Sequence, residues 1–165
     1  MLFHIAALCA FATVLLAGAM TGLYFAFTVA VMPGLNALPA ETAILTMRSL
    51  NRRIVNPWFL AAFLGMPFLA LASGVLLMLT ELRLPAFMLF ASGGVYLVGS
   101  LLPTMFVNVP LNLTLERAVA PADAPGLWQG YARAWTRWNT IRAAATGAGL
   151  LLAALALYWW GQAVT

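Results

Sequence analysis

The chain has very little charge. Only 7% of its 165 residues are charged, whereas 64% are hydrophobic, and the mean hydropathy is +0.97. A soluble domain carries roughly 25% charged residues, so this composition cannot cover a globular surface exposed to water. The sequence therefore indicates an integral membrane protein. Because about 20 apolar residues cross a bilayer, the length allows four spanning helices and little else.

Several residue types that common sites require are missing or scarce. Lysine is absent, so every basic side chain is an arginine. The single cysteine, Cys9, excludes an intramolecular disulfide and a cysteine-based zinc site. The chain also has no phosphate loop and no G-x-S-x-G motif. The net charge of +4 does not indicate nucleic-acid binding. The arginines lie beside apolar segments, where basic residues indicate which side of the membrane a connection occupies.

Histidine and carboxylate side chains are also rare. The single histidine, His4, lies near the outer end of the first apolar run. It could ligate a haem, but no second histidine exists to pair with it, so a structural histidine is favoured. The four carboxylates all fall in connections between apolar runs. No membrane-buried acid is therefore available for proton coupling, which disfavours a transporter.

What the chain does contain is apolar runs of spanning length. They predict an all-α, four-transmembrane-helix bundle in a single membrane domain, 1–165, with spans at about 3–31, 57–79, 85–110 and 140–160. The Met32-Pro33-Gly34 sequence is expected to end the first span. Pro110 is expected to kink or end the third, since proline cannot donate a backbone hydrogen bond.

Small residues recur along the first span. Gly18, Gly22 and Ala26 stand at four-residue spacing, which lets another helix approach closely. Packing within the bundle is the favoured interpretation. A homo-oligomer formed through the Gly18/Gly22 face is the alternative.

Two segments outside the spans have a different character. Residues 39–54 place apolar side chains on one face and charged ones off it, so we expect a short amphipathic helix at the membrane interface between the first two spans. Residues 118–126 predict a loop. An aromatic, arginine-bearing helix then begins at Leu127 and forms an extended cytoplasmic start to the fourth span.

The arginines are distributed unequally between the two sides of such a bundle. The side that holds the turn between the second and third spans carries Arg83 alone. The opposite side carries Arg48, Arg52, Arg53, Arg117, Arg133, Arg137 and Arg142. By the positive-inside rule, the long connections lie in the cytoplasm and both termini lie outside, and we expect a bacterial inner membrane protein.

Polar side chains from three separate segments converge at this arginine-rich end. The first connection supplies Asn51, Arg52 and Asn56, and the third span supplies Thr104, Asn108 and Asn112 at i, i+4 and i+8. The last connection adds one helical face that comprises Trp128, Tyr131, Trp135, Trp138, Asn139 and Arg142. Such groups either cap helix ends and anchor the bundle at the headgroups, or line a ligand pocket.

At these residues the sequence resembles the anthrone oxygenase-like family of small membrane proteins, formerly a domain of unknown function. The resemblance lies in Gly18 and Gly22, the Pro33-Gly34-Leu35 sequence, N-R-R-I-V-N-P at 51–57, T-M-F-V-N-V-P-L-N at 104–112 and the Trp/Tyr/Asn/Arg pattern from Trp128 to Arg142. It implies four membrane helices. For characterised fungal members it also implies oxygenation of an anthrone to an anthraquinone without a known metal or flavin.

The resulting hypothesis is a cofactor-independent membrane oxygenase that binds a hydrophobic planar molecule at the cytoplasmic face. Arg52 and Arg142 would stabilise an enolate, with Asn108 and Asn112 as further catalytic donors. The substrate-binding residues would be Asn51, Asn56, Thr104, Tyr131, Trp135 and Asn139. The alternatives are a non-catalytic membrane protein that binds lipid or a partner protein, and a haem protein that uses His4.

Overall fold

The computed structural model describes residues 1–117 and 123–164, and in these residues the chain is helical. The first run comprises α1 (Leu2–Ala26), the π-helical turn η1 (Phe27–Val31) and α2 (Met32–Asn36). After α3 (Ala40–Ile54) and α4 (Pro57–Met78), another continuous run comprises α5 (Arg83–Tyr96), η2 (Leu97–Leu101), η3 (Thr104–Asn108) and α6 (Val109–Arg117). The last helix is α7 (Ala124–Val164).

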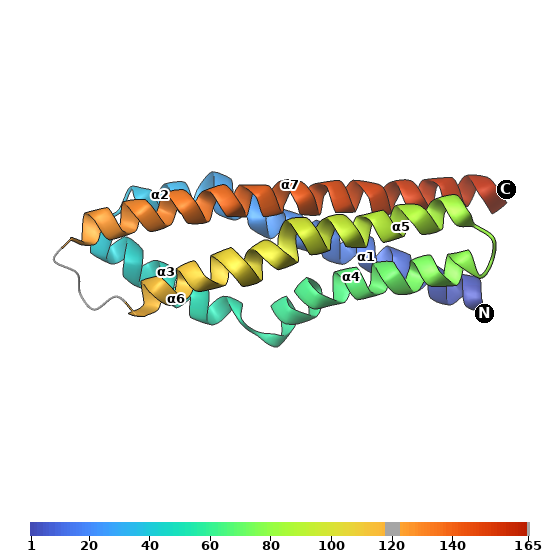
Figure 1. Ribbon diagram of the computed structural model, residues 1–165, viewed down its shortest axis with the longest axis horizontal. Helices are drawn as coiled ribbons and strands as arrows, with labels where there is room; N and C mark the ends of the chain where they lie inside the picture. The colour runs from blue at the N-terminus through green and yellow to red at the C-terminus, as the bar shows by residue number, and fades with distance from the viewer. Residues whose placement is uncertain (118–122, 165) are drawn as a thin grey trace.

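Four helical runs in the described residues are long and apolar enough to cross a membrane. They are Leu2–Asn36, Pro57–Met78, Arg83–Arg117 and Ala124–Ala163. Their order in space is a closed ring, since α1 and α5 each pack against both α4 and α7. Both termini and the α4–α5 turn lie at one end of this bundle (Figure 1). The predicted all-α four-helix membrane bundle is confirmed.

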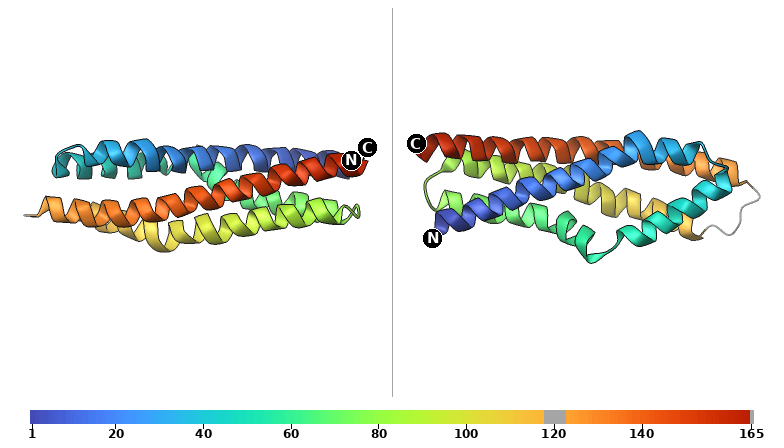
Figure 2. Two further views of the ribbon diagram at one scale, coloured as in Figure 1. Left: turned by 90° about the horizontal axis from the view of Figure 1, so that it is seen from above. Right: turned by 180° about the vertical axis from the view of Figure 1, so that it is seen from behind.

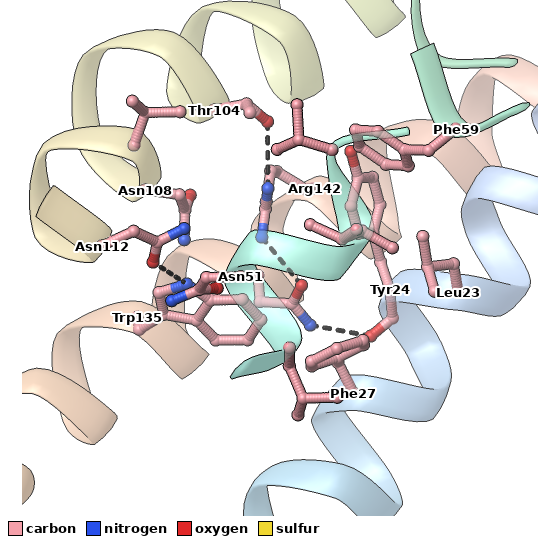
Figure 3. A pocket seen from close by; sticks show the side chains of 15 residues that line it. Leu23, Tyr24, Phe27, Asn51, Phe59, Thr104, Asn108, Asn112, Trp135 and Arg142 are labelled. Atoms are coloured by element: carbon pink, nitrogen blue, oxygen red, sulfur yellow. Dashed lines mark hydrogen bonds between the residues drawn. The ribbon is translucent and has the colours of Figure 1, made fainter. Parts of the chain in front are cut away.

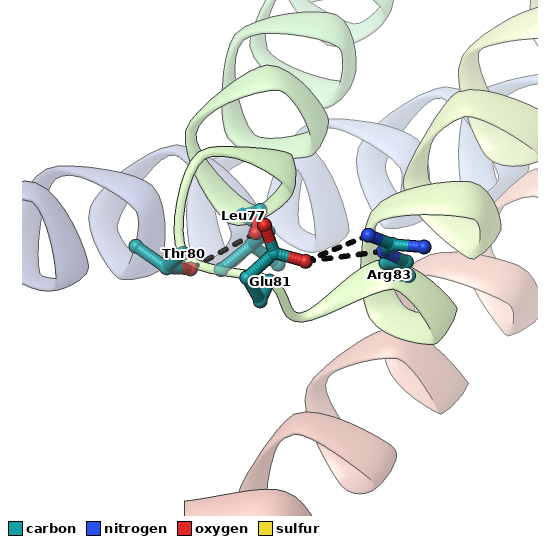
Figure 4. A network of polar contacts seen from close by, with 4 residues as sticks. All are labelled: Leu77, Thr80, Glu81 and Arg83. Atoms are coloured by element: carbon teal, nitrogen blue, oxygen red, sulfur yellow. Dashed lines mark hydrogen bonds and ion pairs between the residues drawn. The ribbon is translucent and has the colours of Figure 1, made fainter.

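The turn between α4, which ends at Met78, and α5, which begins at Arg83, is short. Glu81 adopts a positive φ of 62°, which closes the chain within a few residues. Its carboxylate pairs with Arg83 at 2.9 Å, and the Thr80 hydroxyl donates to the Leu77 carbonyl (Figure 4). Arg83, which the sequence analysis expects to be alone on this side of the bundle, is thus part of an exposed ion pair.

The helix ends expected at Pro33 and considered at Pro110 are absent. The first run continues through Pro33 and Gly34 to Asn36, and the third continues past Pro110 to Arg117. The expectation that Met32-Pro33-Gly34 ends the first helix is therefore wrong, and Pro110 does not end the third helical run. The bounds of the membrane spans stay a prediction.

The physical reason lies in the π-helical turns. Each ends two residues before a proline: η1 before Pro33, η2 before Pro103 and η3 before Pro110. A proline ring clashes with the carbonyl of residue i−4 in a regular α-helix and supplies no N–H group. The wider π turn shifts that carbonyl, so the helix continues through the proline.

The amphipathic segment forms as predicted. Pro39 is the N-cap of α3, and Ala43, Ile44 and Met47 are buried on its apolar face. That face packs against protein rather than lipid, in a core shared with Leu115 of α6 and with α7. Figure 2 shows α3 folding back along the bundle at the end opposite the termini. This end therefore has a hydrophobic core of its own.

The small residues of α1 do not make the contact that was favoured for them. A side chain built at Gly18 or Gly22 would meet nothing within 4 Å, and Gly22 is exposed. Packing within the bundle at these glycines is therefore wrong, and the homo-oligomer face stays a prediction. Close helix approach occurs instead at Gly99, which lies against Ala145 of α7.

The start of the last helix differs slightly from the prediction. Residues 118–126 were expected to form a loop, but α7 already begins at Ala124 and residues 118–122 lie outside the described part of the chain. From there α7 is continuous to Val164, so the aromatic segment does feed directly into the fourth span.

Candidate functional site

A pocket lies where η1, α3 and η3 surround the middle of α7 (Figure 3). Its enclosed volume is about 100 Å³. Its polar lining consists of Asn51, Thr104, Asn108, Asn112, Asn139 and Arg142. Its aromatic lining consists of Tyr24, Phe27, Phe59 and Trp135, and aliphatic side chains complete it. The structure thus brings together polar groups that the sequence placed on three separate segments.

Arg142 is the charged group of this pocket. It is only 4% exposed. Its Nη1 donates to Thr104 Oγ1 at 3.0 Å and its Nη2 donates to Asn139 Oδ1 at 2.9 Å. The guanidinium carbon lies 4.4 Å from the centroid of the Tyr24 ring and 5.4 Å from that of Trp135. Aromatic faces and neutral oxygens therefore hold the positive charge.

No carboxylate lines this pocket. The ion pairs in the described residues, Arg52–Glu116 and Arg83–Glu81, both lie on exposed surface. A buried guanidinium without an acidic partner is costly, since charges inside proteins are normally paired. The arrangement leaves a net positive charge facing the pocket, and such a site favours an anionic ligand atom.

Asn139 fixes the position of the guanidinium. Its Nδ2 donates to the Tyr24 backbone carbonyl at 2.7 Å and to Thr28 Oγ1 at 2.8 Å. Both acceptors come from the first helical run, where η1 follows directly after α1. With the amide nitrogen used in this way, Asn139 Oδ1 must face Arg142.

Asn112 closes another side of the pocket. Its Oδ1 accepts hydrogen bonds from Tyr131 Oη at 2.8 Å and from Trp135 Nε1 at 3.0 Å. The Tyr131 hydroxyl in turn accepts from Asn51 Nδ2 at 3.5 Å. Tyr131 therefore holds Asn112 in position by a hydrogen bond but does not itself line the pocket. This network joins α3, α6 and α7.

Asn108 has no such partners. It is 1% exposed, yet both its Nδ2 and its Oδ1 lack a hydrogen bond, and so does Nε of Arg142. An unsatisfied buried polar group costs roughly 1–3 kcal/mol, and native proteins contain few of them. Three such atoms on two residues of one pocket leave hydrogen-bonding capacity that ordered water or a bound molecule would use.

Two residues that were expected in the site lie outside it. Arg52 is exposed and pairs with Glu116 at 2.7 Å, because α3 and α6 are neighbours at this end. Asn56 is the N-cap of α4: its Oδ1 accepts from the Phe59 N–H at 3.0 Å and its Nδ2 donates to the Arg53 carbonyl. Local partners therefore occupy both polar heads, and neither residue lines the pocket.

Three other predicted positions also lie away from the pocket. Trp128 donates its Nε1 hydrogen to Asn36 Oδ1 at 3.0 Å in the hydrophobic core next to α3. Trp138 is half-buried and does not line the pocket. His4 is exposed in the first turn of α1, at the opposite end of the bundle (Figure 1). A haem on His4 would therefore be separate from this pocket.

The contribution of the first helical run was missed. Tyr24 and Phe27 line the pocket, and Thr28 positions Asn139. In the sequence these residues are part of a long apolar run, where aromatics normally indicate packing. The available signal was a polar pair, Tyr24 and Thr28, at i and i+4 inside a segment with few other polar groups.

The fold and the pocket together define a class: a four-span integral membrane protein whose helices enclose a cationic, aromatic-walled site. The family model described as anthrone oxygenase matches residues 56–152, which is more than half of the chain. The chain therefore belongs to the anthrone oxygenase family. No curated protein and no solved structure shows significant similarity to it. The matched region includes Thr104, Asn108 and Arg142, whereas Tyr24 and Asn51 precede it.

The unpaired amide of Asn108 leads to a test of whether this position is maintained for binding rather than stability. Asn108→Leu replaces a buried, unsatisfied amide with an apolar side chain of similar size, so we expect the free energy of unfolding to rise by roughly 1 kcal/mol. Thermal or denaturant unfolding in detergent measures this change. The matched control is Asn112→Leu, which strands the donors of Tyr131 and Trp135 and should be destabilising. A destabilising Asn108→Leu change would show that the amide has structural partners.

Proposed function

We propose that the protein is a membrane oxygenase that converts a planar aromatic ketone of the anthrone type to the corresponding quinone, without a cofactor. The observation that carries the proposal is the buried Arg142 guanidinium, which has hydrogen bonds to neutral oxygens but no acidic partner. Membership of the anthrone oxygenase family supports the reaction class. The pocket supplies the electrostatics that this reaction needs.

The chemistry follows from the acidity of the substrate. Loss of a proton from the methylene carbon of an anthrone gives an enolate whose negative charge lies largely on the ketone oxygen. Preorganised donors stabilise such a developing charge, and in a water-poor site they do so strongly. In the proposal, Arg142 Nε–H and the Asn108 amide N–H donate to this oxygen, since both are unpaired in the free protein.

The electron-rich enolate then reacts with dioxygen. The substrate carbon bonds to one oxygen atom and forms a peroxide, and cleavage of the O–O bond with loss of the remaining C–H proton gives the second ketone. One oxygen atom remains in the quinone and the other leaves as water, so the methylene carbon is oxidised and dioxygen is reduced. No other oxidant or reductant is required.

The first proton passes to water in this proposal. None of the four carboxylates lines the pocket, and His4 lies at the far end of the bundle. The protein therefore promotes ionisation by stabilising the enolate rather than by supplying a general base. Asn51, which lines the pocket, would contact the water that accepts the proton.

The size of the pocket determines how the substrate lies. Pockets for drug-sized ligands measure roughly 300–1,000 Å³, whereas the enclosed volume here is about 100 Å³. The pocket therefore takes the ketone edge of a tricyclic substrate, and the remaining rings lie in the mouth beside Val55 and Phe59. The Trp135 ring offers a flat surface for stacking inside the pocket, and the Phe59 ring offers one at its mouth.

Substitution of the two donors tests the proposal. Arg142→Ala and Asn108→Ala should each reduce the rate of quinone formation from an anthrone in detergent or vesicles, by about 10²–10³-fold if each acts as an oxyanion donor. The matched control is Arg137→Ala, which removes an exposed arginine from the same helix and should leave the rate unchanged. Arg52→Ala should also have little effect, because Arg52 lies outside the pocket. Rates of the Arg142 and Asn108 variants equal to that of the parent would refute the assignment.

We also propose that the end of the bundle with the pocket faces the cytoplasm. The elements α3 and α6 and the first part of α7 lie at that end (Figure 1), and they carry the exposed residues Arg53, Arg117, Arg133 and Arg137. Arg83 begins α5, next to the turn at the opposite end. This asymmetry matches the positive-inside rule. Reporter fusions after Thr165 should be active only when the reporter works outside the cytoplasm, and a C-terminus found inside the cytoplasm would reverse the orientation.

A further inference from the structure

A second hollow lies on the outside of the bundle, between α4 and the α5–η2 run. Its volume is about 590 Å³, and apolar side chains and two glycines line it. The absence of side chains at Gly93 and Gly94 deepens it on one wall, and Pro67 and Phe68 of α4 form the other. A side chain built at Gly94 would meet nothing within 4 Å, so the hollow reaches the helix backbone there.

The position of this groove exposes it to the bilayer. Its α4 residues fall within the Pro57–Met78 span, and its other residues fall within the Arg83–Arg117 span. Phe68 is 69% exposed at its edge. An apolar groove at this depth meets acyl chains and molecules dissolved among them.

The groove and the pocket border the same helical run, Arg83–Arg117. Leu97 and Leu101 stand at the two ends of η2, and Thr104 and Asn108 stand at the two ends of η3. The first two line the groove and the last two line the pocket. The two hollows therefore lie beside successive turns of one helical run, although they have no lining residue in common.

One core cluster packs against a lining residue of each hollow. Phe59 lines the pocket and Leu101 lines the groove, and both pack against the same core of Phe63 and Tyr96. Phe59 and Phe63 are stacked, with their ring centroids 5.4 Å apart. A cluster that contains aromatic rings therefore borders both hollows.

We infer that the α4–α5 groove is the binding and access site through which a planar, uncharged aromatic ketone enters the Arg142 pocket from the bilayer. The inference rests on the proposed function for the identity of its occupant. The volume of the groove falls within the range for drug-sized ligands, whereas that of the inner pocket does not. The groove binds the neutral ketone, and the cationic pocket binds the enolate formed from it.

A substitution that fills the groove tests this inference by ligand labelling, which does not depend on enzymatic activity. Gly94→Leu should fold normally, since space is open at that position, and should obstruct the groove. The matched control is Gly18→Leu, which adds the same side chain at an open position on α1. The probe is benzophenone, a photoreactive aromatic ketone, which is irradiated with the protein in phosphatidylcholine vesicles. Labelled residues are mapped by mass spectrometry.

We expect benzophenone to label Phe68 and Leu97 in the parent and in Gly18→Leu. Added anthraquinone should compete for the groove and reduce this labelling. Gly94→Leu should lose this labelling. Labelling that persists in Gly94→Leu, or that anthraquinone does not reduce, would overturn the inference and identify the groove as an acyl-chain surface. Loss of labelling in both variants would also overturn it, because the effect would not be specific to the groove.

Kinetics separate the groove from the proposed function. With anthrone supplied in the vesicle membrane, Gly94→Leu should lower kcat/KM several-fold and leave kcat at saturation unchanged, since the Arg142 pocket is intact. A fall in kcat as large as the fall in kcat/KM would mean that Gly94 affects the chemical step, and it would contradict an access role. If neither parent nor variant oxidises anthrone while the labelling pattern holds, the oxygenase proposal fails and the ketone-binding groove stands.

Discussion

The burial of one guanidinium without a carboxylate is the constraint on which this structure depends. Arg142 loses most of its hydration inside a helical bundle, a cost of several kcal/mol that an acidic partner would normally offset. Here Thr104 and Asn139 supply neutral oxygens, and Tyr24 and Trp135 supply aromatic faces. These groups come from three helical runs, so the bundle must bring all three together at one depth. The charge that remains uncompensated is what the pocket offers to a ligand.

The prolines contribute to this convergence through the π turns that precede them. η1 carries Phe27 and Thr28, and η3 carries Thr104 and Asn108, so both turns place residues in or next to the pocket. A π turn rotates the following side chains relative to a regular helix and often occurs at functional sites. The same feature thus lets the helix pass a proline and directs polar groups inward. Asn108, at the end of η3, is the residue left without partners.

Much of the fold could be predicted from the sequence, because spanning helices depend on composition and length alone. The amphipathic face of α3 and the joining of the aromatic segment to the last span were likewise read from periodicity. The continuation through Pro33 and Pro110 could not be predicted, since proline chemistry favours a break and only the widened turns relieve it.

The site was predicted in part, for an equally physical reason. Spacing correctly placed Thr104, Asn108, Asn112, Asn139 and Arg142 toward one hollow. Spacing does not show which polar groups have nearer partners: Glu116 binds Arg52, and the start of α4 uses Asn56. Tyr24 was missed because an aromatic in an apolar run has the same local pattern whether it packs or holds a charge.

The central claim is that Arg142 stabilises an oxyanion on an aromatic ligand, and the ionisation of a bound dye measures this directly. A hydroxyanthraquinone changes colour when its phenol ionises and does not turn over, so its spectrum can be followed against pH when it is bound to the protein. We expect the bound phenol to ionise at lower pH in the parent than in an Arg142→Met variant or in protein-free vesicles. Ionisation at the same pH in all three samples would contradict it.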